Sequence, residues 1–326
     1  MNLLTGKRVL VTGGAGFIGS SICHDLLERG NQVVCLDNFA TGKRENIKDL
    51  KGNPGFKLIE GDIRDPETCH KAVKGVDVVL HQAALGSVPR SIADPATTNA
   101  VNINGFLNML IATRDAGIKR FVYASSSSVY GDSPELPKVE ERTGKVLSPY
   151  AITKLVNEEY ARVFGNLYGM ETIGLRYFNV FGRRQDPNGP YAAVIPKFTM
   201  AFMKYNSPVI NGDGSNSRDF TYIDNVVMAN NLAATVENPA ALNQAYNVAC
   251  GDSVNLNEMT SMLRSYLADK DPKIATVNPL HGPNRAGDIP HSMASIGKAV
   301  RLLGYNPQVL FSEGLKRAVE WYVDNL

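Results

Sequence analysis

Residues 9–20 read VLVTGGAGFIGS, and this stretch decides the fold of the chain. It begins with an apolar, β-rich run and ends in a helical pattern that Gly30 closes. Gly13, Gly16 and Gly19 span the junction at GxxGxxG spacing. The first glycine of such a turn permits the tight bend, the second lets the backbone approach a pyrophosphate, and the third allows close packing of helix on strand. Because the free N–H groups of the helix then face the phosphates, the stretch predicts a dinucleotide-binding turn.

The rest of the first half repeats this alternation of strand and helix. Short apolar runs at 32–37, 56–61 and 76–84 are separated by helical patterns, and two long helices are expected at about 99–116 and 149–168. Strands that are apolar on both faces indicate a parallel sheet covered by helices on both sides. The predicted fold class is therefore α/β, a Rossmann-type doubly wound parallel sheet.

The second half has loops richer in Gly, Asn, Asp and Pro, and shorter helices. The run AYNVAC at 245–250 has the pattern of one more sheet strand, so the chain is expected to return to the first domain and leave it again. We expect residues 1–178, joined by about 220–250, to form a nucleotide-binding domain. Residues 179–219 and 251–326 are expected to form a smaller interleaved α/β lobe.

The composition is that of an ordinary globular protein, with 44% hydrophobic and 20% charged residues in a chain of 326. A net charge of +2 gives no concentrated basic field for nucleic acid or an anionic membrane. No apolar run reaches the roughly 20 residues of a membrane span, and the first strand starts too early for a signal peptide. We therefore expect a cytoplasmic protein that binds neither membrane nor nucleic acid. The four scattered cysteines and the histidine spacing predict reduced thiols and no metal.

An acidic residue follows the second strand at the position that selects the cofactor. Asp37 ends the run QVVCLD, where a carboxylate can hydrogen-bond the ribose hydroxyls of adenosine and repel a 2′-phosphate. This residue favours NAD over NADP. Lys43 and Arg44 follow it and could pair with a phosphate, but a solvated loop is the favoured interpretation. The run GDIRD places Asp62 and Ile63 where an adenine ring would lie in this fold.

The run SPYAITK at 148–154 carries the candidate acid–base chemistry. Ser148 and Pro149 are typical of a helix N-cap and of the first helical position. Tyr150 and Lys154 then share one face of the helix, so the ammonium can sit beside the phenol. That cation and a positive nicotinamide ring would lower the phenol pKa from its ordinary value of about 10. The pattern predicts a general base that works near neutral pH.

These motifs, with LDNFATG, SVYGD and RYFNVFG, occur in the order and spacing of the extended short-chain dehydrogenases/reductases over nearly the whole chain. The sequence resembles the nucleotide-sugar 4-epimerases of that family. HQAALGSVPRSIADP, RYFNVFGRRQDPNGPYAAVIPKF and NGDGSNSRDFTYIDNV are similar to the bacterial branch that interconverts UDP-N-acetylglucosamine and UDP-N-acetylgalactosamine. The resemblance implies tightly bound NAD. It also implies that Tyr150 takes the 4-OH proton while C4 gives up its hydride, that the 4-keto sugar turns, and that hydride returns to its opposite face.

The resemblance gives a role to the four serines at 125–128, which follow an apolar strand. It assigns the serine of a Ser-Tyr-Lys triad to Ser126, whose hydroxyl would bridge the sugar 4-OH and Tyr150. The sister 4,6-dehydratases carry an acidic pair at the next two positions, and sister decarboxylases carry a Glu at the second. This chain has Ser127 and Ser128 there. With no acid to drive elimination, the 4-keto sugar is expected to persist until hydride returns.

The resemblance also assigns the second lobe to the UDP-sugar. Arg218 and Arg285 would bind the diphosphate, since a guanidinium matches phosphate oxygens and stays charged. Ser292 stands where enzymes restricted to glucose and galactose often have a tyrosine, so it leaves room for an N-acetyl group at C2. The other positions assigned to the cofactor are Phe17, Ile18, Asn38, Gln82, Ala83, Ala84, Asn102 and Tyr177, and those assigned to the substrate are Gly86, Ser87, Asn179, Val194 through its backbone, Asn211 and Asp288.

The sequence leaves three alternatives open. Relatives that act on UDP-glucuronate or UDP-N-acetylglucosaminuronate also suit the SSSSVYG pattern, a nucleotide-sugar 4,6-dehydratase is disfavoured by Ser127 and Ser128, and a non-catalytic NAD-binding regulator would be expected to have lost Tyr150 or Lys154. The resemblance further implies a homodimer through the two long helices and a role in surface polysaccharide biosynthesis.

Overall fold

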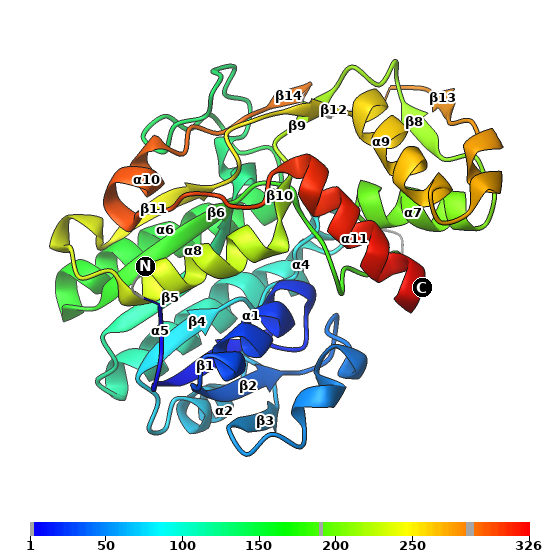
Figure 1. The fold of residues 1–326 in the computed structure, drawn as a ribbon. Helices are drawn as coiled ribbons and strands as arrows, with labels where there is room; N and C mark the ends of the chain where they lie inside the picture. The colour runs from blue at the N-terminus through cyan, green and yellow to red at the C-terminus, as the bar shows by residue number, and fades with distance from the viewer. Residues whose placement is uncertain (1–2, 189–191, 285–289) are drawn as a thin grey trace.

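The central element of the structure is a parallel sheet of seven strands (Figure 1). The computed structural model describes residues 3–188, 192–284 and 290–326. The strand order is β11-β6-β5-β4-β1-β2-β3, and every neighbouring pair is parallel. The predicted doubly wound sheet is therefore confirmed. Its strands are β1 (Arg8–Thr12), β2 (Gln32–Asp37), β3 (Phe56–Glu60), β4 (Val78–His81), β5 (Arg120–Ser126), β6 (Glu171–Tyr177) and β11 (Gln244–Val248).

Successive side chains of each strand enter two different helical layers, which is why these strands are apolar throughout. Val9 and Val11 of β1 pack in a cluster with one layer, and Leu10 packs in a second cluster with the other. The first layer is α1 (Phe17–Glu28) and α8 (Ile223–Thr235). The second layer is α2 (Pro66–Ala72), α5 (Phe106–Asp115) and α6 (Pro149–Tyr168), with the short α3 (Val88–Ala93) and α4 (Pro95–Asn99) against α6.

Helix ends follow the signals predicted from the sequence. Gly30 takes a φ of +76° just beyond the end of α1. The Ser148 hydroxyl accepts a hydrogen bond from the Ala151 N–H at 3.1 Å, which caps α6. These two local predictions are confirmed. They could be made from the sequence because a glycine end and a serine cap act within a few residues and need no tertiary contact.

The helix expected at about 99–116 differs from the prediction in its first part. Helix α4 begins at Pro95, and η2 (Ala100–Gly105) is a π-helical stretch before α5. The buried Asn102 side chain lies in this stretch, where its Oδ1 accepts from the Leu85 N–H at 2.8 Å and its Nδ2 donates to the Leu85 carbonyl at 3.3 Å. These bonds tie the helix to the loop after β4, and a π turn lets a helical side chain reach such a partner.

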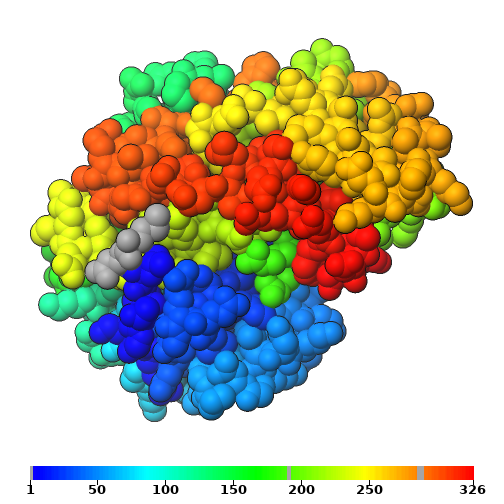
Figure 2. Space-filling view, in the orientation of Figure 1, coloured from blue at the N-terminus to red at the C-terminus, as the bar shows by residue number. Residues whose placement is uncertain are grey.

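The remaining segments form a smaller lobe beside the sheet. Figure 2 shows the segments beyond residue 250, yellow to red, across the upper part of the molecule, with the red C-terminal segment next to the blue N-terminal segments. Strand β11 joins the sheet next to β6, so the predicted return of the chain is confirmed; the division into two functional units stays a proposal. The lobe contains α7 (Val194–Met203), α9 (Leu256–Ala268), α11 (Phe311–Asn325), and the short strands β7 (Val180–Phe181), β8 (Val209–Asn211), β9 (Ser217–Arg218), β10 (Thr221–Tyr222), β12 (Val254–Asn255), β13 (Leu280–Gly282) and β14 (His291–Ser292). Helix α10 (Gly297–Leu303) instead packs against β11 and α8.

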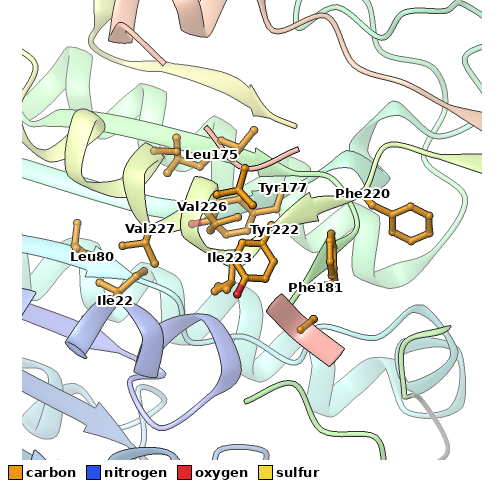
Figure 3. Packing of buried hydrophobic residues seen from close by; sticks show 14 of the residues in the cluster. Ile22, Leu80, Leu175, Tyr177, Phe181, Phe220, Tyr222, Ile223, Val226 and Val227 are labelled. Carbon is orange, nitrogen blue, oxygen red and sulfur yellow. The ribbon is translucent and has the colours of Figure 1, made fainter. Parts of the chain in front are cut away.

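One hydrophobic cluster joins the lobe to the sheet (Figure 3). It runs from Ile22 of α1 and Leu175 of β6 to Phe181 and Tyr222, whose rings lie edge to face with centroids 5.6 Å apart. Because protein interiors are close-packed, this shared cluster fixes the lobe against the sheet and so fixes the walls of the space between them.

Within the described ranges, no helix is long and apolar enough to cross a membrane. All four cysteines are free thiols, and Cys23, Cys35 and Cys69 are buried.

Candidate active site

A cavity of about 570 Å³ lies at the carboxyl ends of the sheet strands. This is the edge where doubly wound folds bind ligands. Most of the residues that the sequence assigned to the cofactor and to catalysis line it, together with some assigned to the substrate: Gly13, Gly16, Phe17, Ile18, Gly19, Asp37, Asn38, Asp62, Ile63, Gln82, Ala83, Ala84, Gly86, Ser126, Ser127, Tyr150, Lys154, Tyr177 and Asn179.

The glycine turn forms one wall, and its glycines are required by close backbone contacts. Gly13 has a φ of +66°, and a Cβ there would lie 2.8 Å from the backbone of Ala83. A Cβ on Gly19 would lie 2.1 Å from the Gly13 carbonyl oxygen. The expected roles of the first glycine in a tight bend and the third in close helix packing are thus visible in the geometry. This leaves bare backbone and the start of α1 facing the cavity, which fits a pyrophosphate.

The adenosine end of the cavity is built around Asp37. Its buried carboxylate accepts hydrogen bonds from the Ala15 N–H at 2.9 Å and the Phe39 N–H at 2.8 Å, and burial raises its pKa. Each oxygen keeps a free lone pair for a ribose hydroxyl. The two cations nearby are already paired, Lys43 with Asp186 and Arg44 with Glu60, both at 2.8 Å. This end therefore fits the 2′-hydroxyl of NAD better than the 2′-phosphate of NADP.

Asp62 lies beside Asp37 at the end of β3. It accepts from Asn38 Nδ2 at 2.8 Å and forms an ion pair with Arg64 at 2.7 Å. Arg64, with a smaller contribution from Asn38, holds the pKa of Asp62 at about 2. The carboxylate is thus ionised at neutral pH and held in place as a hydrogen-bond acceptor at the edge of the cavity.

The opposite end of the cavity brings together Ser126, Tyr150 and Lys154. Ser126 ends β5, while the other two residues lie on the first turn and a half of α6. The Lys154 ammonium donates to the Ala124 carbonyl at 2.8 Å and lies 5.9 Å from the centroid of the Tyr150 ring. Burial lowers its pKa to about 8. The three side chains have the arrangement of an acid–base group beside a reacting hydroxyl.

Lys154 alone does not lower the pKa of the Tyr150 phenol in this structure, and the lowering expected from Lys154 together with a positive nicotinamide stays a prediction. Burial raises the pKa of Tyr150, and the hydrogen bond with Ser126 only partly opposes that effect. The reason is geometric: the Lys154 ammonium points to a backbone carbonyl of β5 and not to the phenol oxygen. Ser126 is therefore the residue that favours the phenolate here.

No acid lies beside Tyr150 among the described residues that line the cavity; the carboxylates of that lining, Asp37 and Asp62, belong to the adenosine end. Ser127 and Ser128 follow Ser126 in a 3₁₀ turn. Ser127 lines the cavity, whereas the Ser128 hydroxyl is buried and has no hydrogen-bond partner.

Several predicted site residues do not line the cavity. Asn102 lies behind it in the π-helical stretch, and Ser87 caps α3 by accepting from the Arg90 N–H at 3.2 Å. Val194 begins α7, and Asn211, Arg218 and Ser292 lie on the short strands of the lobe. Arg285 and Asp288 lie outside the described residues.

The lobe strands are linked to the cavity through Asp219. Asn179, which lines the cavity, donates from Nδ2 to the Asp219 carbonyl at 3.1 Å. The Asp219 N–H in turn donates to the Ser292 carbonyl at 2.8 Å, and Ser292 pairs in register with Arg218. Arg218 and Ser292 are thus held at a fixed position relative to Asn179 in the wall of the cavity.

Sequence reasoning missed other residues of the lining, among them Thr41, Arg64, Thr97 and Gln185. Thr41 and Arg64 lie within motifs that were recognised, so the motif was a usable signal. Gln185 also lies within a recognised stretch, residues 176–198, whereas Thr97 on α4 gave no signal, because it reaches the cavity only through the packing of the folded chain. The same is true of Asn230 on α8, whose amide holds both the Tyr177 hydroxyl and Gln82 at 2.9 and 3.0 Å.

The chain belongs to the NAD dependent epimerase/dehydratase family, whose model matches residues 9–249. It is 38% identical to a putative UDP-glucose 4-epimerase of Methanocaldococcus jannaschii, over 97% of this chain and 99% of that protein. The structure is similar to a UDP-N-acetylglucosamine 4-epimerase from Methanobrevibacter ruminantium solved with UDP-N-acetylmuramic acid (TM-score 0.92, 38% identity, 99% and 100% of the two chains). It is also similar to a UDP-glucose 4-epimerase of Thermotoga maritima solved with UDP-glucose (TM-score 0.89, 34% identity, 97% and 99%).

The cofactor of this protein is NAD. The glycine turn would hold its pyrophosphate and Asp37 its adenosine ribose, so the nicotinamide would lie toward Tyr150 and Lys154 at the opposite end of the cavity. When bound there, NAD supplies a reversible acceptor for the hydride of a substrate carbon.

Proposed function

We propose that this protein interconverts UDP-N-acetylglucosamine and UDP-N-acetylgalactosamine at C4 of the sugar. Its family and its relatives make it an NAD-dependent UDP-sugar 4-epimerase. The choice of sugar is the new element of the proposal, and the size of the side chain at position 292 carries it.

The proton chemistry is assigned to Tyr150 and Ser126. The Tyr150 phenol exchanges a proton with the sugar 4-OH, and the Ser126 hydroxyl bridges the two oxygens. Lys154 supplies a positive charge that is fixed at the Ala124 carbonyl, 2.8 Å away. A fixed cation in a dry site costs no reorganisation when negative charge develops on the phenol.

Epimerisation is favoured over dehydration because the reacting end of the cavity lacks an acid among its described residues. Loss of water from a 4-keto sugar needs a group that removes the C5 proton and another that protonates the leaving hydroxyl. Ser127 and Ser128 can do neither near neutral pH, because a serine hydroxyl does not titrate there. The 4-keto sugar is therefore kept intact for the return step.

The preference for an N-acetyl sugar rests on Ser292. Its backbone is fixed by pairing with Arg218, the residue proposed to bind the diphosphate, and by the hydrogen bond from the Asp219 N–H at 2.8 Å. Since the backbone is held in this way, the volume at the position depends on the side chain alone. A half-buried serine leaves space that a tyrosine would fill.

Ser292→Tyr is expected to block the N-acetyl substrate selectively. We expect kcat/KM for UDP-N-acetylglucosamine to fall roughly 100-fold, while the value for UDP-glucose changes less than about fivefold, because a steric obstacle discriminates by added repulsion. The measurement is the initial rate of C4 inversion with each sugar nucleotide.

The matched control is His291→Tyr, which places a tyrosine at the neighbouring, exposed position of the same strand. It should leave both rates within about twofold, as surface substitutions usually do. An equal loss of kcat/KM for the two sugar nucleotides in Ser292→Tyr would count against the proposal that Ser292 leaves room for the N-acetyl group.

We also propose a homodimer formed through the layer of α5 and α6. The outer face of α6 carries exposed apolar side chains, Ile152 and Leu167, at 48% and 69% exposure, and Ile92 of the adjacent α3 is 63% exposed. Apolar groups gathered in one layer are typical of a protein interface.

A further inference from the structure

A buried polar cluster lies on the α6 side of the sheet, directly behind the candidate catalytic residues. It consists of Ser125, Glu158 and Arg176, which we call the Glu158 cluster. Arg176 and Glu158 form a two-point ion pair, Nη2–Oε2 at 2.8 Å and Nε–Oε1 at 2.9 Å, and their side chains are only 6% and 11% exposed. The Ser125 hydroxyl donates to Glu158 Oε1 at 2.5 Å.

Ser125 itself lines the cavity, and the other two members stand next to lining residues, Arg176 before Tyr177 and Glu158 one helical turn after Lys154. Ser125 and Arg176 are partners in the register of β5 and β6, and the next pair in that register is Ser126 with Tyr177. Because side chains alternate along a strand, holding Ser125 and Arg176 on the α6 face turns Ser126 and Tyr177 toward the cavity. One carboxylate on α6 thus fixes the ends of two strands that carry site residues.

The same carboxylate faces the candidate lysine. Glu158 follows Lys154 by four residues on α6, so the two side chains lie on one face of the helix. The Lys154 ammonium is buried, and its hydrogen-bond partner is a neutral carbonyl, that of Ala124. A buried cation is costly unless a negative charge is near. Glu158 is the carboxylate whose negative charge raises the pKa of Lys154.

Other groups around the pair do not replace Glu158. From β4, His81 faces Lys154, and burial holds its pKa at about 3, so it is neutral. Tyr123 of β5 lies near Glu158 and Tyr130 lies against Arg176, and burial raises the pKa of both phenols. Arg176 is held further by the Tyr130 hydroxyl and by the Glu140 carbonyl, both at 3.0 Å, and stays protonated. Glu159 of α6 is exposed and pairs with Arg162.

We propose that Glu158 is a positioning residue for the epimerisation, which orients the ends of β5 and β6 toward the cavity and supports the charge of Lys154. The expected effect of Glu158 on turnover rests on the proposed function. The structural part of the proposal, the orientation of the strand ends, does not depend on which sugar is turned over.

The test is Glu158→Gln in the holoenzyme, which keeps the shape and one acceptor oxygen but removes the charge. We expect kcat to fall about 10- to 100-fold with little change in KM, since small displacements of reacting groups have effects of that size. Glu158 raises the pKa of Lys154, which burial has lowered to about 8. Removing the carboxylate lowers that pKa further, so the ammonium is lost at lower pH, and the alkaline limb of the pH profile should move down by about one unit.

Amide hydrogen exchange gives a readout that needs no turnover. The amides at the ends of β5 and β6 should exchange faster in Glu158→Gln than in the parent protein, because local opening there becomes easier. The matched control is Glu159→Gln, which removes the neighbouring exposed carboxylate of the same helix. It should leave kcat, the pH profile and the exchange pattern unchanged.

Glu158→Asp separates charge from position. It should keep the alkaline limb near that of the parent while lowering kcat at every pH and speeding exchange at the strand ends. Glu158→Asp also tests the positioning role of Glu158 if Glu158→Gln fails to fold. The proposal is overturned if Glu158→Gln shows an unmoved pH profile and unchanged exchange, or if Glu158→Asp matches the parent in both rate and exchange. If the parent turns over neither UDP-N-acetylglucosamine nor UDP-glucose, the proposed function fails, and the exchange comparison still decides the role of Glu158.

Discussion

Tyr150→Phe is expected to lower kcat by about 10³-fold, within the range that proton transfer contributes to enzymatic rates. The substitution removes one oxygen and keeps the ring, so α6 and the cavity wall should stay intact. The phenol is the group placed beside Ser126, and its hydrogen bond with that serine is what lowers its pKa against the effect of burial. Without the Tyr150 hydroxyl, no group at this end of the described cavity lining takes the 4-OH proton at neutral pH.

The measurement for Tyr150→Phe is the rate of C4 inversion followed by proton NMR, with NAD content determined on the same sample. Tyr160→Phe, which removes a hydroxyl from the middle of the same helix, should retain the parent rate. A Tyr150→Phe enzyme with more than about a tenth of the parent kcat would mean that another group transfers the proton, contrary to this assignment.

Gly19→Ala is expected to abolish NAD binding and to destabilise the fold. A Cβ at this position would lie 2.1 Å from the Gly13 carbonyl oxygen and 2.8 Å from Gly14 Cα, and both obstacles are backbone atoms that cannot rotate away. Either α1 moves off the sheet or the turn opens, and each movement displaces the N–H groups that face the pyrophosphate. Overpacking of this kind costs about 1–3 kcal/mol in the free energy of unfolding.

NAD released from the purified variant by acid, together with urea unfolding, measures both effects of Gly19→Ala. Gly52→Ala is the control, because a Cβ there meets nothing within 4 Å. It should retain its NAD and its stability. If Gly19→Ala purified with a full complement of NAD, the turn would not hold the pyrophosphate as described.

Local signals made much of the fold predictable. The glycine turn, the apolar strands and the Ser148 cap act over a few residues, and each was recognisable from the sequence. The π-helical stretch at Ala100–Gly105 was not, because it depends on a hydrogen bond between Asn102 and Leu85, a contact across the fold. The two-residue strands β9 and β14 are too short to show any periodicity.

The candidate site was predictable where a motif carried it and not where packing did. Tyr150 and Lys154 are four residues apart, so their proximity follows from the helix alone. The direction of the Lys154 ammonium, and with it the pKa of Tyr150, depends on a carbonyl of β5 that the sequence pattern does not reveal. The Glu158 cluster joins residues of β5, α6 and β6, and only the folded chain brings them together.

An NMR measurement of the purified protein with UDP-N-acetylglucosamine and no added cofactor tests the proposed epimerisation at its most specific point. We expect UDP-N-acetylgalactosamine to appear without net formation of NADH, because the hydride returns to the sugar and NAD stays bound. If UDP-N-acetylglucosamine stayed unchanged, even with NAD supplied, while UDP-glucose or UDP-glucuronate was inverted under the same conditions, the assignment of the N-acetyl sugar from Ser292 would be contradicted.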